Sequence, residues 1–317
     1  MTPQGASGPA RAVAVDQVAK QFGATKALDG VSVEIDTGEL FGFIGPDGAG
    51  KTTLFRILAT LLVPTAGRAQ VLGIDVVRGI WDLRQAIGYM PGRFSLYPDL
   101  SVEENLRFFA SVFGTTIERE YQNIAPIYVQ IEPFKERRAA ALSGGMKQKL
   151  ALCCALVHRP RILFLDEPTT GVDAVSRREF WDLLGRLKSG GLTIVVSTPY
   201  MDEATRCDRV ALIEKGRLLS VDTPAHIVAS YGRPLFDVYV HDRYRALLAL
   251  RRFPHTFTIY PFGETLHYTD NRPAPANDTV GREVEAFLQR EGIDGARVQP
   301  ATPTVEDSFM AMMGRPE

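Results

Sequence analysis

Short apolar runs rich in β-branched residues alternate with helical stretches from Val13 to about Thr223. This alternation is typical of α/β proteins built on a mostly parallel sheet. Three of the runs, FGFI, ILFL and TIVVS, contain almost only apolar residues, which predicts strands that are covered on both faces. The candidate core strands are Val31–Ile35, Leu40–Ile44, Ile87–Tyr89, Ile162–Leu165, Thr193–Ser197 and Val210–Glu214.

Between Leu96 and Ala141 the pattern becomes helical, and NLRFFASVFG is its clearest stretch. Apolar residues recur there at helical spacing, and strand-like runs do not occur. We predict a helical subdomain at about residues 95–145, inserted between two core strands. A longer crossover connection is the alternative interpretation.

After a turn near Tyr231–Pro234 the order of elements changes to strand, helix, two strands around Gly263, helix and strand. A closing helix is expected at Val305–Met313. This order predicts a small α+β domain of the split βαβ type at residues 231–317. We interpret the polar residues 269–279 as a flexible connector, residues 1–10 as a flexible tail, and residues 11–230 as the main domain.

Composition changes this picture little. The chain has 317 residues, 45% of them hydrophobic, and a net charge of −1, so it lacks the basic excess that usually accompanies nucleic-acid binding. No apolar stretch reaches the ~18 residues that a membrane-spanning helix needs. The three cysteines are without metal-ligand spacing, which favours buried free thiols in a reducing compartment.

The strongest chemical signal directly follows the strand at Leu40–Ile44 and matches the pattern G-x-x-x-x-G-K-S/T. Glycines let such a loop curl so that its amides point at phosphates, and the helical stretch behind it adds a positive helix end. Lys51 would contact the β- and γ-phosphates, and Thr52 would bind Mg²⁺. A chance glycine turn is the alternative. The predicted phosphate-binding residues are Gly45, Pro46, Asp47, Gly48, Ala49, Gly50, Lys51, Thr52 and Thr53.

A second signal is the apolar run that ends in Asp166 and Glu167. It places Asp166 at the carboxyl edge of a buried strand, where α/β sheets hold ligands. Asp166 can bind Mg²⁺ through oxygen, and Glu167 is then placed to orient or deprotonate a water. Two surface carboxylates that merely end a strand are the alternative.

Upstream of Asp166 stands Leu142-Ser-Gly-Gly-Met-Lys-Gln148, at the start of an apolar helix. Ser143 alone would indicate only a helix start. Together with the phosphate loop and the LDEP strand end, however, the chain resembles the ATP-binding subunits of ABC transporters over residues 11–230. The resemblance implies a P-loop NTPase cassette with a RecA-like mixed sheet and a helical subdomain.

The resemblance also implies how such chains work. Two cassettes face each other head to tail, and each ATP lies between one phosphate loop and the partner's LSGGMKQ. It implies that Phe22 stacks on adenine; a plain core residue is the alternative. The signature and interface residues that it implies are Ser143, Gly144, Gly145, Gln148 and Asp173.

The implied partners are a second ATP-binding subunit, as a homodimer or a heterodimer, and a polytopic membrane permease. The implied location is cytoplasmic, on the inner face of the cell membrane. The stretch Ser101–Leu106 resembles the part that meets the permease. The C-terminal tail resembles that of drug-efflux-type members, including daunorubicin-resistance-like ATPases, which favours export.

Two positions depart from the family pattern. Gly92 stands where the Q-loop glutamine is expected, and Pro199 stands where the switch histidine is expected. Neither residue replaces the lost side chain, because glycine offers only backbone and proline has no amide donor. We expect slow hydrolysis at this chain's own site and a heterodimer in which its LSGGMKQ completes another site. The alternatives are substitution by Arg93 or Tyr200, and a regulatory subunit that binds ATP with little hydrolysis.

Overall fold

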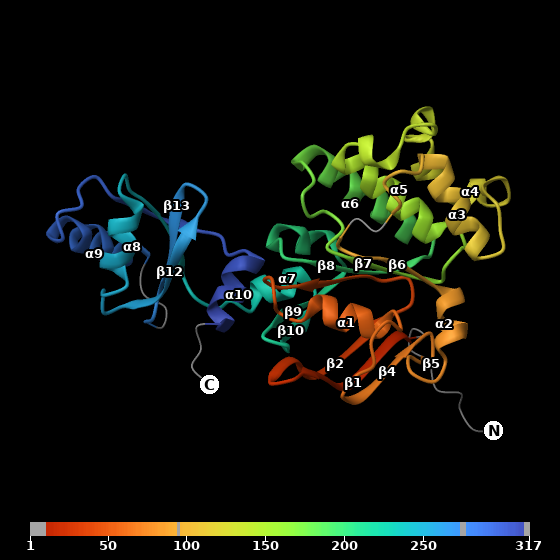
Figure 1. Ribbon diagram of the computed structural model, residues 1–317. Helices are drawn as coiled ribbons and strands as arrows, with labels where there is room; N and C mark the ends of the chain where they lie inside the picture. Colours follow the sequence, from red (N-terminus) through yellow and green to blue (C-terminus); the bar gives the residue numbers. More distant parts are fainter. Residues whose placement is uncertain (1–10, 94–95, 273–276, 314–317) are drawn as a thin grey trace, which may run out of the picture. The chain divides into compact units, whose positions relative to one another are not determined.

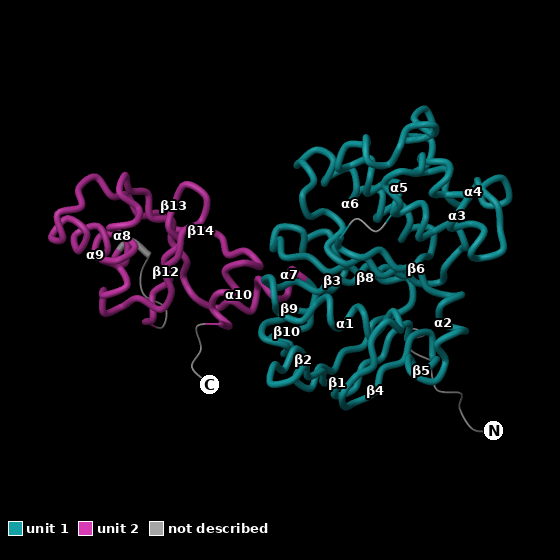
Figure 2. The backbone as a smooth tube through the Cα atoms, in the orientation of Figure 1, with its two compact units in different colours: residues 1–223 teal, residues 224–317 magenta. Residues whose placement is uncertain are grey.

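The computed structural model describes residues 11–93, 96–272 and 277–313. The chain divides into two compact units, residues 1–223 and 224–317, which Figure 2 shows in teal and magenta. The tail predicted at residues 1–10 lies outside the described residues. Each unit has its own hydrophobic core.

The first unit is built on a six-stranded sheet with the order β10-β9-β3-β8-β7-β6. Its strands β3, β6, β7, β8 and β9 run parallel, while β10 pairs with β9 in the antiparallel sense. This mixed sheet confirms the predicted fold class. The strands are β3 Leu40–Ile44, β6 Ile87–Met90, β7 Ile162–Asp166, β8 Thr193–Thr198, β9 Arg209–Glu214 and β10 Arg217–Asp222.

A second, antiparallel sheet in this unit has the order β2-β1-β4-β5. Only part of β2 was among the candidate strands. The longest unpredicted strand, β1, is interrupted near Gln17, where φ is 48° and the register with β2 shifts, so its apolar alternation is broken. The strands are β1 Arg11–Phe22, β2 Thr25–Asp36, β4 Ala66–Val71 and β5 Ile74–Asp75.

Helix α1, Lys51–Leu58, lies between the two sheets (Figure 1). Its Phe55 ring makes edge contacts with Phe43 of β3 and Phe164 of β7, with ring centroids 5.8 and 6.0 Å apart. All three rings are fully buried. This packing fixes the start of α1 against the carboxyl ends of β3 and β7, where the candidate chemistry lies.

Helices α3, α4 and α5 occupy the interval between β6 and β7. No named strand interrupts them in the described part of this interval, which supports the insertion over a simple crossover. Helix α3 begins with a capping box, in which Ser101 and Glu104 each bond the other's backbone amide. The remaining helix bounds in this unit are α2 Ile80–Ala86, α3 Val102–Val112, α4 Ile117–Tyr128, α5 Gly144–Leu156 and α6 Ala174–Ser189.

The second unit is a four-stranded antiparallel sheet with the order β12-β13-β11-β14. The element order after α7 is β-α-β-β-α-β followed by a helix, as the sequence predicts. Helices α8 and α9 pack on one face over Phe236, Leu266 and Tyr268. The elements are α7 Pro224–Ala229, β11 Leu235–Tyr239, α8 Arg243–Leu250, β12 Thr256–Phe262, β13 Thr265–Asp270, α9 Asn277–Arg290, β14 Arg297–Ala301 and α10 Val305–Met313.

Two boundaries in this unit differ from the expected ones. Thr269 and Asp270 belong to β13 rather than to a connector, because their pairing with β11 and β12 continues to Asp270. Residues 273–276 of that connector lie outside the described residues. The unit also begins at Pro224, ahead of residue 231, because α7 packs against α10.

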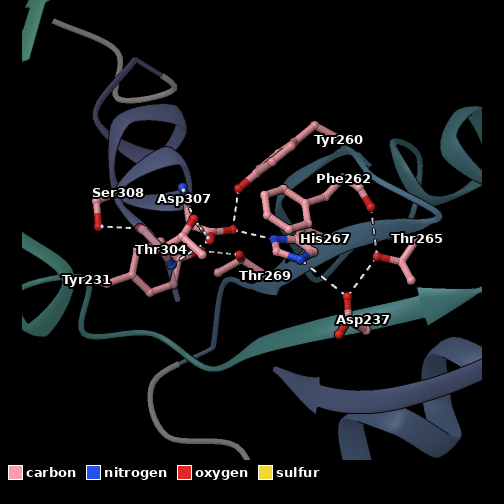
Figure 3. Close-up of polar contacts among 10 residues, drawn as sticks. All are labelled: Tyr231, Asp237, Tyr260, Phe262, Thr265, His267, Thr269, Thr304, Asp307 and Ser308. Atoms are coloured by element: carbon pink, nitrogen blue, oxygen red, sulfur yellow. Dashed lines mark hydrogen bonds and ion pairs between the residues drawn. The ribbon is translucent and has the colours of Figure 1, made fainter. Parts of the chain in front are cut away.

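The other face of this sheet and the start of α10 carry buried and half-buried polar residues, which we call the C-terminal polar cluster: Asp237, Tyr260, Thr265, His267, Thr304 and Asp307 (Figure 3). His267 contacts Asp307 through Nδ1 at 2.6 Å and Asp237 through Nε2 at 3.3 Å. Thr304 donates its amide and hydroxyl to Asp307 at 2.7 and 2.6 Å. The cluster attaches α10 to the sheet.

Candidate nucleotide site

The loop from Gly45 to Gly50 joins the buried strand β3 to the first turn of α1. Gly50, the N-cap of α1, has φ 105°, a conformation that L side chains rarely adopt. A Cβ there would also lie 2.5 Å from the carbonyl oxygen of Ala27. Within the described residues no side chain caps this helix, so its first amides are left for another acceptor. The loop therefore has the geometry of an anion cradle.

Lys51 is buried at this helix start, with 3% of its surface exposed. Its Nζ donates to the carbonyl oxygens of Gly45 and Pro46 at 2.7 and 2.9 Å and lies 3.2 Å from Oε1 of Glu167. The three N–H donors of the Lys51 ammonium group thus point at two carbonyl oxygens of the loop and at the Glu167 carboxylate. This arrangement keeps a buried positive charge at the cradle.

A cavity of about 130 Å³ opens over the loop. It is lined by residues of the predicted phosphate loop, by the start of α1 and by the predicted catalytic carboxylate of Glu167. Ala27, from strand β2, was not predicted. The lining residues are Ala27, Gly48, Gly50, Lys51, Thr52, Thr53 and Glu167.

Asp166 ends β7 beside this cavity and is 2% exposed. Its Oδ1 accepts hydrogen bonds from the hydroxyl groups of Thr52 at 3.2 Å and Ser197 at 2.6 Å. Burial, and then the nearby charge of Asp166, raises the pKa of Tyr89 to about 12. Tyr89 therefore stays neutral, and the carboxylate is the local negative charge.

Glu167 follows in a left-handed backbone conformation with φ 49°. Its amide donates to the carbonyl oxygen and to Oγ of Ser197, both at 3.0 Å. A non-glycine residue keeps such a conformation only where its surroundings fix it. The strand end of β8 thus sets the direction of the Glu167 side chain toward Lys51.

The donor set of this site fits a nucleotide triphosphate with Mg²⁺. Helix-end amides and a lysine suit phosphate oxygens, while a hydroxyl and a carboxylate suit the oxygen-preferring Mg²⁺. Thr52 and Asp166, the two predicted metal ligands, already share a hydrogen bond. The structure therefore brings together the predicted loop, metal-binding and catalytic residues.

The predicted signature residues do not line this cavity. Ser143 caps α5 by accepting from the Met146 amide at 3.3 Å, and Gln148 lies within α5, partly buried. Gly145 packs so closely on α6 that a Cβ would lie 2.8 Å from Oγ of Ser176. Asp173 caps α6, and the amides of Ser176 and Val175 that it accepts lower its pKa. These residues form a second, separate group on the same unit.

Phe22 ends β1 and is 50% exposed, so the core interpretation of this residue is wrong. The Lys20 ammonium lies 5.2 Å from the centre of its ring. An exposed ring with a cation at its face can offer a platform to a planar base. Its stacking on adenine stays a prediction.

The two departures from the family pattern lie close to the carboxylates. A Cβ on Gly92 would be 2.9 Å from the carbonyl oxygen of Asp166, so a glutamine there would need the backbone to shift. Pro199 follows Thr198 at the end of β8. Tyr200 donates its amide to Thr198 at 3.0 Å, and the Arg177 guanidinium lies 4.8 Å from the centre of its ring. Arg93 is exposed.

Sequence reasoning missed Ser197, which bonds both Asp166 and Glu167. A serine that ends the apolar strand TIVVS was a usable signal, because polar residues at the carboxyl edge of a parallel sheet face the ligand site. It also missed Glu203, which is 3% exposed and bonded to Thr169 and Thr198. No local motif marks that residue.

The mixed sheet, the cradle and the Asp166–Glu167 strand end define a P-loop nucleotide-binding protein. Comparison with known proteins specifies the family. The ABC transporter family matches residues 28–170. The chain is 34% identical to the daunorubicin resistance ATP-binding protein DrrA3 of Streptomyces coeruleorubidus over 96% of each chain. It therefore belongs to the family of ABC transporter ATP-binding proteins.

Other relatives have related names. The chain is 36% identical to the Nod factor export ATP-binding protein I of Burkholderia pseudomallei, over 94% of this chain and 96% of that protein. It is 43% identical to the probable multidrug ABC transporter ATP-binding protein YbhF of Escherichia coli over 67% of this chain. This match covers 37% of the length of YbhF.

Solved structures agree on the fold. The cbiO1 protein of Clostridium perfringens, part of the ABC transporter complex cbiONQ, superposes with a TM-score of 0.63 at 26% identity, over 77% of this chain and 96% of that one. A dimeric ATP-binding cassette bound to ADP and phosphate superposes with a TM-score of 0.61 at 27% identity, over 67% and 98%. In the part of the chain described here, no helix is both long and apolar enough to cross a membrane.

Proposed function

We propose that this chain binds ATP with Mg²⁺ in the cradle at Gly45–Thr53 and hydrolyses it to drive an ABC transporter. The observation that carries this proposal is the convergence of the buried Lys51 ammonium, the helix start and Glu167 at one cavity. Thr52 and Asp166 would hold Mg²⁺, which would supply positive charge against the negative charge that develops on the phosphates.

In this proposal the protein residues position and polarise the phosphate chain. The loop amides and Lys51 hold the phosphates, and Thr52 and Asp166 hold the metal. Glu167 orients a water and accepts its proton, at a place fixed by the two bonds from its amide to Ser197. Electrostatic and positional effects of this kind supply most of the catalysis of phosphoryl transfer.

We infer that the site is completed by a second ATP-binding subunit. The separation of Ser143, Gly144 and Gly145 from the cavity within one chain supports this, as does the dimeric form of the cassette with ADP and phosphate. The helix start behind Ser143 would offer amides to the γ-phosphate bound by the partner. Asp173 and Gln148 would lie at the same interface.

We infer further that this chain's own site turns over slowly. The Q-loop and switch side chains are absent at Gly92 and Pro199, and removal of one polar group aimed at the transition state costs about 10²–10³ in rate. In the described residues, neither Arg93 nor the Tyr200 hydroxyl contacts Glu167. These facts favour a heterodimer, in which this chain's LSGGMKQ serves a faster site.

The proposed direction of transport is export, and the proposed location is the cytoplasmic face of the membrane, bound to a polytopic permease. The names of two relatives over nearly the full chain, a drug resistance protein and an export protein, support this. No nucleic acid is involved in the proposal.

The test is phosphate release by the purified chain, measured for the wild type, Glu167→Gln and Pro199→His. We expect slow release in the wild type, none above background in Glu167→Gln with ATP binding retained, and faster release in Pro199→His. Fast release in a wild type that Pro199→His leaves unchanged would contradict the slow-site proposal.

A regulatory subunit that binds ATP without hydrolysis is the second candidate, and the absence of a side-chain donor at Pro199 favours it. It predicts stoichiometric ATP binding and no phosphate release even when the permease and a second ATP-binding subunit are present. Release that depends on Glu167 would exclude it.

A further inference from the structure

The buried carboxylate of Glu203, which lies outside the proposed catalytic site, links the segments around Glu167. Glu203 lies in the short helical turn Met201–Arg206 after β8 and is 3% exposed. A carboxylate so deeply buried is costly unless other groups neutralise it or donate to it. Its partners therefore indicate why it is there.

These partners come from three separate segments. Oε2 of Glu203 accepts from the Thr198 hydroxyl at the end of β8 at 2.5 Å, and Oε1 accepts from Thr169 at 2.9 Å. Nε of Arg177, in α6, lies 3.8 Å from Oε1. One side chain thus joins the end of β8, the loop after β7 and the second turn of α6.

Glu167 lies between two of these attachments. On one side its amide bonds Ser197, the neighbour of Thr198. On the other side, two residues along the chain, Thr169 is held by Glu203. Because the left-handed backbone of Glu167 persists only where its surroundings hold it, the two attachments act on the segment that aims this carboxylate at the cavity.

The substitution at residue 199 increases the importance of this link. Pro199 has neither a polar side chain nor an amide donor. The turn after β8 is instead attached by the Thr198 hydroxyl, which donates to Glu203 and accepts from the Tyr200 amide at 3.0 Å. The Arg177 guanidinium, which lies near Glu203, also covers the Tyr200 ring.

We propose that Glu203 is a positioning residue for hydrolysis: through Thr169 and Thr198 it clamps the loop that carries Glu167 to the end of β8. The clamp also extends to α6, whose N-cap is Asp173, the proposed interface residue. The inference rests on the proposed hydrolysis for its effect on rate, but the clamp itself is a property of the free chain.

The first test is amide hydrogen exchange in the full chain without nucleotide. The Thr170 and Val172 amides bond the carbonyl oxygens of Glu167 and Thr169, both at 3.2 Å, so they report on this loop. We expect Glu203→Ala to raise their exchange rates about tenfold and Glu203→Gln to raise them less, because glutamine can still bond both threonines. Asp202→Asn, on the exposed side of the same turn, is the matched control.

The second test separates binding from turnover. We expect Glu203→Ala to lower kcat about tenfold while the Kd for ATP changes less than threefold, and Glu203→Gln to recover most of kcat. If Glu203→Ala does not fold, Thr169→Val removes one donor and should change the same two quantities in the same direction.

Unchanged exchange at Thr170 and Val172 in a folded Glu203→Ala chain, together with unchanged kcat, would overturn the inference. A wild-type chain that binds no ATP would refute the proposed function instead, and the exchange measurement would still test the clamp.

Discussion

The two units of this protein each contain a buried polar cluster, and the clusters differ in what their polar atoms face. In the cradle, Lys51 and the first turn of α1 border a cavity of about 130 Å³. In the C-terminal polar cluster, His267 contacts both Asp237 and Asp307, and hydroxyl groups complete the bonding of the two carboxylates (Figure 3). The uncapped amides at the start of α1 are open to a ligand, whereas the polar groups of the C-terminal polar cluster bond one another and hold elements together.

The largest difference between the two clusters is expected in turnover, when one carboxylate in each cluster is replaced by an amide. Asp166→Asn should lower turnover about 10²–10³-fold, because the proposed metal loses a negative ligand in a buried site. Phosphate release under saturating ATP measures this. Asp307→Asn is the matched variant in the other unit and should leave turnover within about twofold. Equal losses in both variants would contradict the division of roles.

The C-terminal polar cluster should instead contribute to the stability of the second unit. Asp307→Asn should destabilise the second unit by about 3 kcal/mol, because the amide has one acceptor oxygen where the buried carboxylate accepts from His267, Thr304 and Tyr260. Urea unfolding followed by hydrogen exchange in residues 235–270 measures this. Asp294→Asn, an exposed aspartate of the same unit, should cause almost no change. A stable Asp307→Asn protein would show that the cluster does not hold the unit together.

Two exposed aromatic residues, one in each unit, test the same difference through the affinity for ATP. Phe22→Ala should raise the Kd for ATP about tenfold, because stacking of one base on an aromatic ring contributes about 1–3 kcal/mol. Since Phe22 is half exposed, the free energy of unfolding should hardly change. Tyr244→Ala removes an aromatic ring that is 72% exposed in the other unit and should leave the Kd unchanged.

The smallest expected effect is a pH dependence confined to the second unit. Burial alone would raise the pKa of Asp307, but hydrogen bonds from His267, Thr304 and Tyr260 outweigh it and lower the pKa below 3.8. A lowered pKa in the folded state stabilises above the unfolded value and loses this contribution as pH falls. The stability difference between wild type and Asp307→Asn should therefore shrink below about pH 4, as measured by urea unfolding at pH 3 to 6.

The cradle could be predicted from sequence because its parts are contiguous. Gly45 to Thr53 form one loop and helix start, so a local pattern contains nearly the whole phosphate site. The strand ends at Asp166 and Glu167 could be placed for the same reason, since an apolar run determines where a core strand stops. The apolar runs predicted the α/β fold as well, whereas the mixed sheet was implied by the resemblance to ABC cassettes.

Residues that work at a distance could not be predicted. Glu203 matters because β7 and β8 are neighbours in the sheet, which no local pattern of the chain expresses, whereas Ser197 is marked only by its place at the end of an apolar strand. The C-terminal polar cluster joins residues 237, 260, 265, 267, 304 and 307 from four elements and one loop. The antiparallel strands β4 and β10 were missed because many of their residues are exposed or half-buried, so they lack a continuous apolar run.

The central claim is that the loop at Gly45–Thr53 grips a nucleotide through Lys51. Its most direct test is the Kd for ATP with Mg²⁺, measured by calorimetry for the wild type, Lys51→Ala and the exposed-site control Lys135→Ala. We predict that Lys51→Ala raises the Kd about a hundredfold, as expected for the loss of charge-assisted bonds in a buried site, while Lys135→Ala binds like the wild type. Equal affinity in all three proteins would contradict the account.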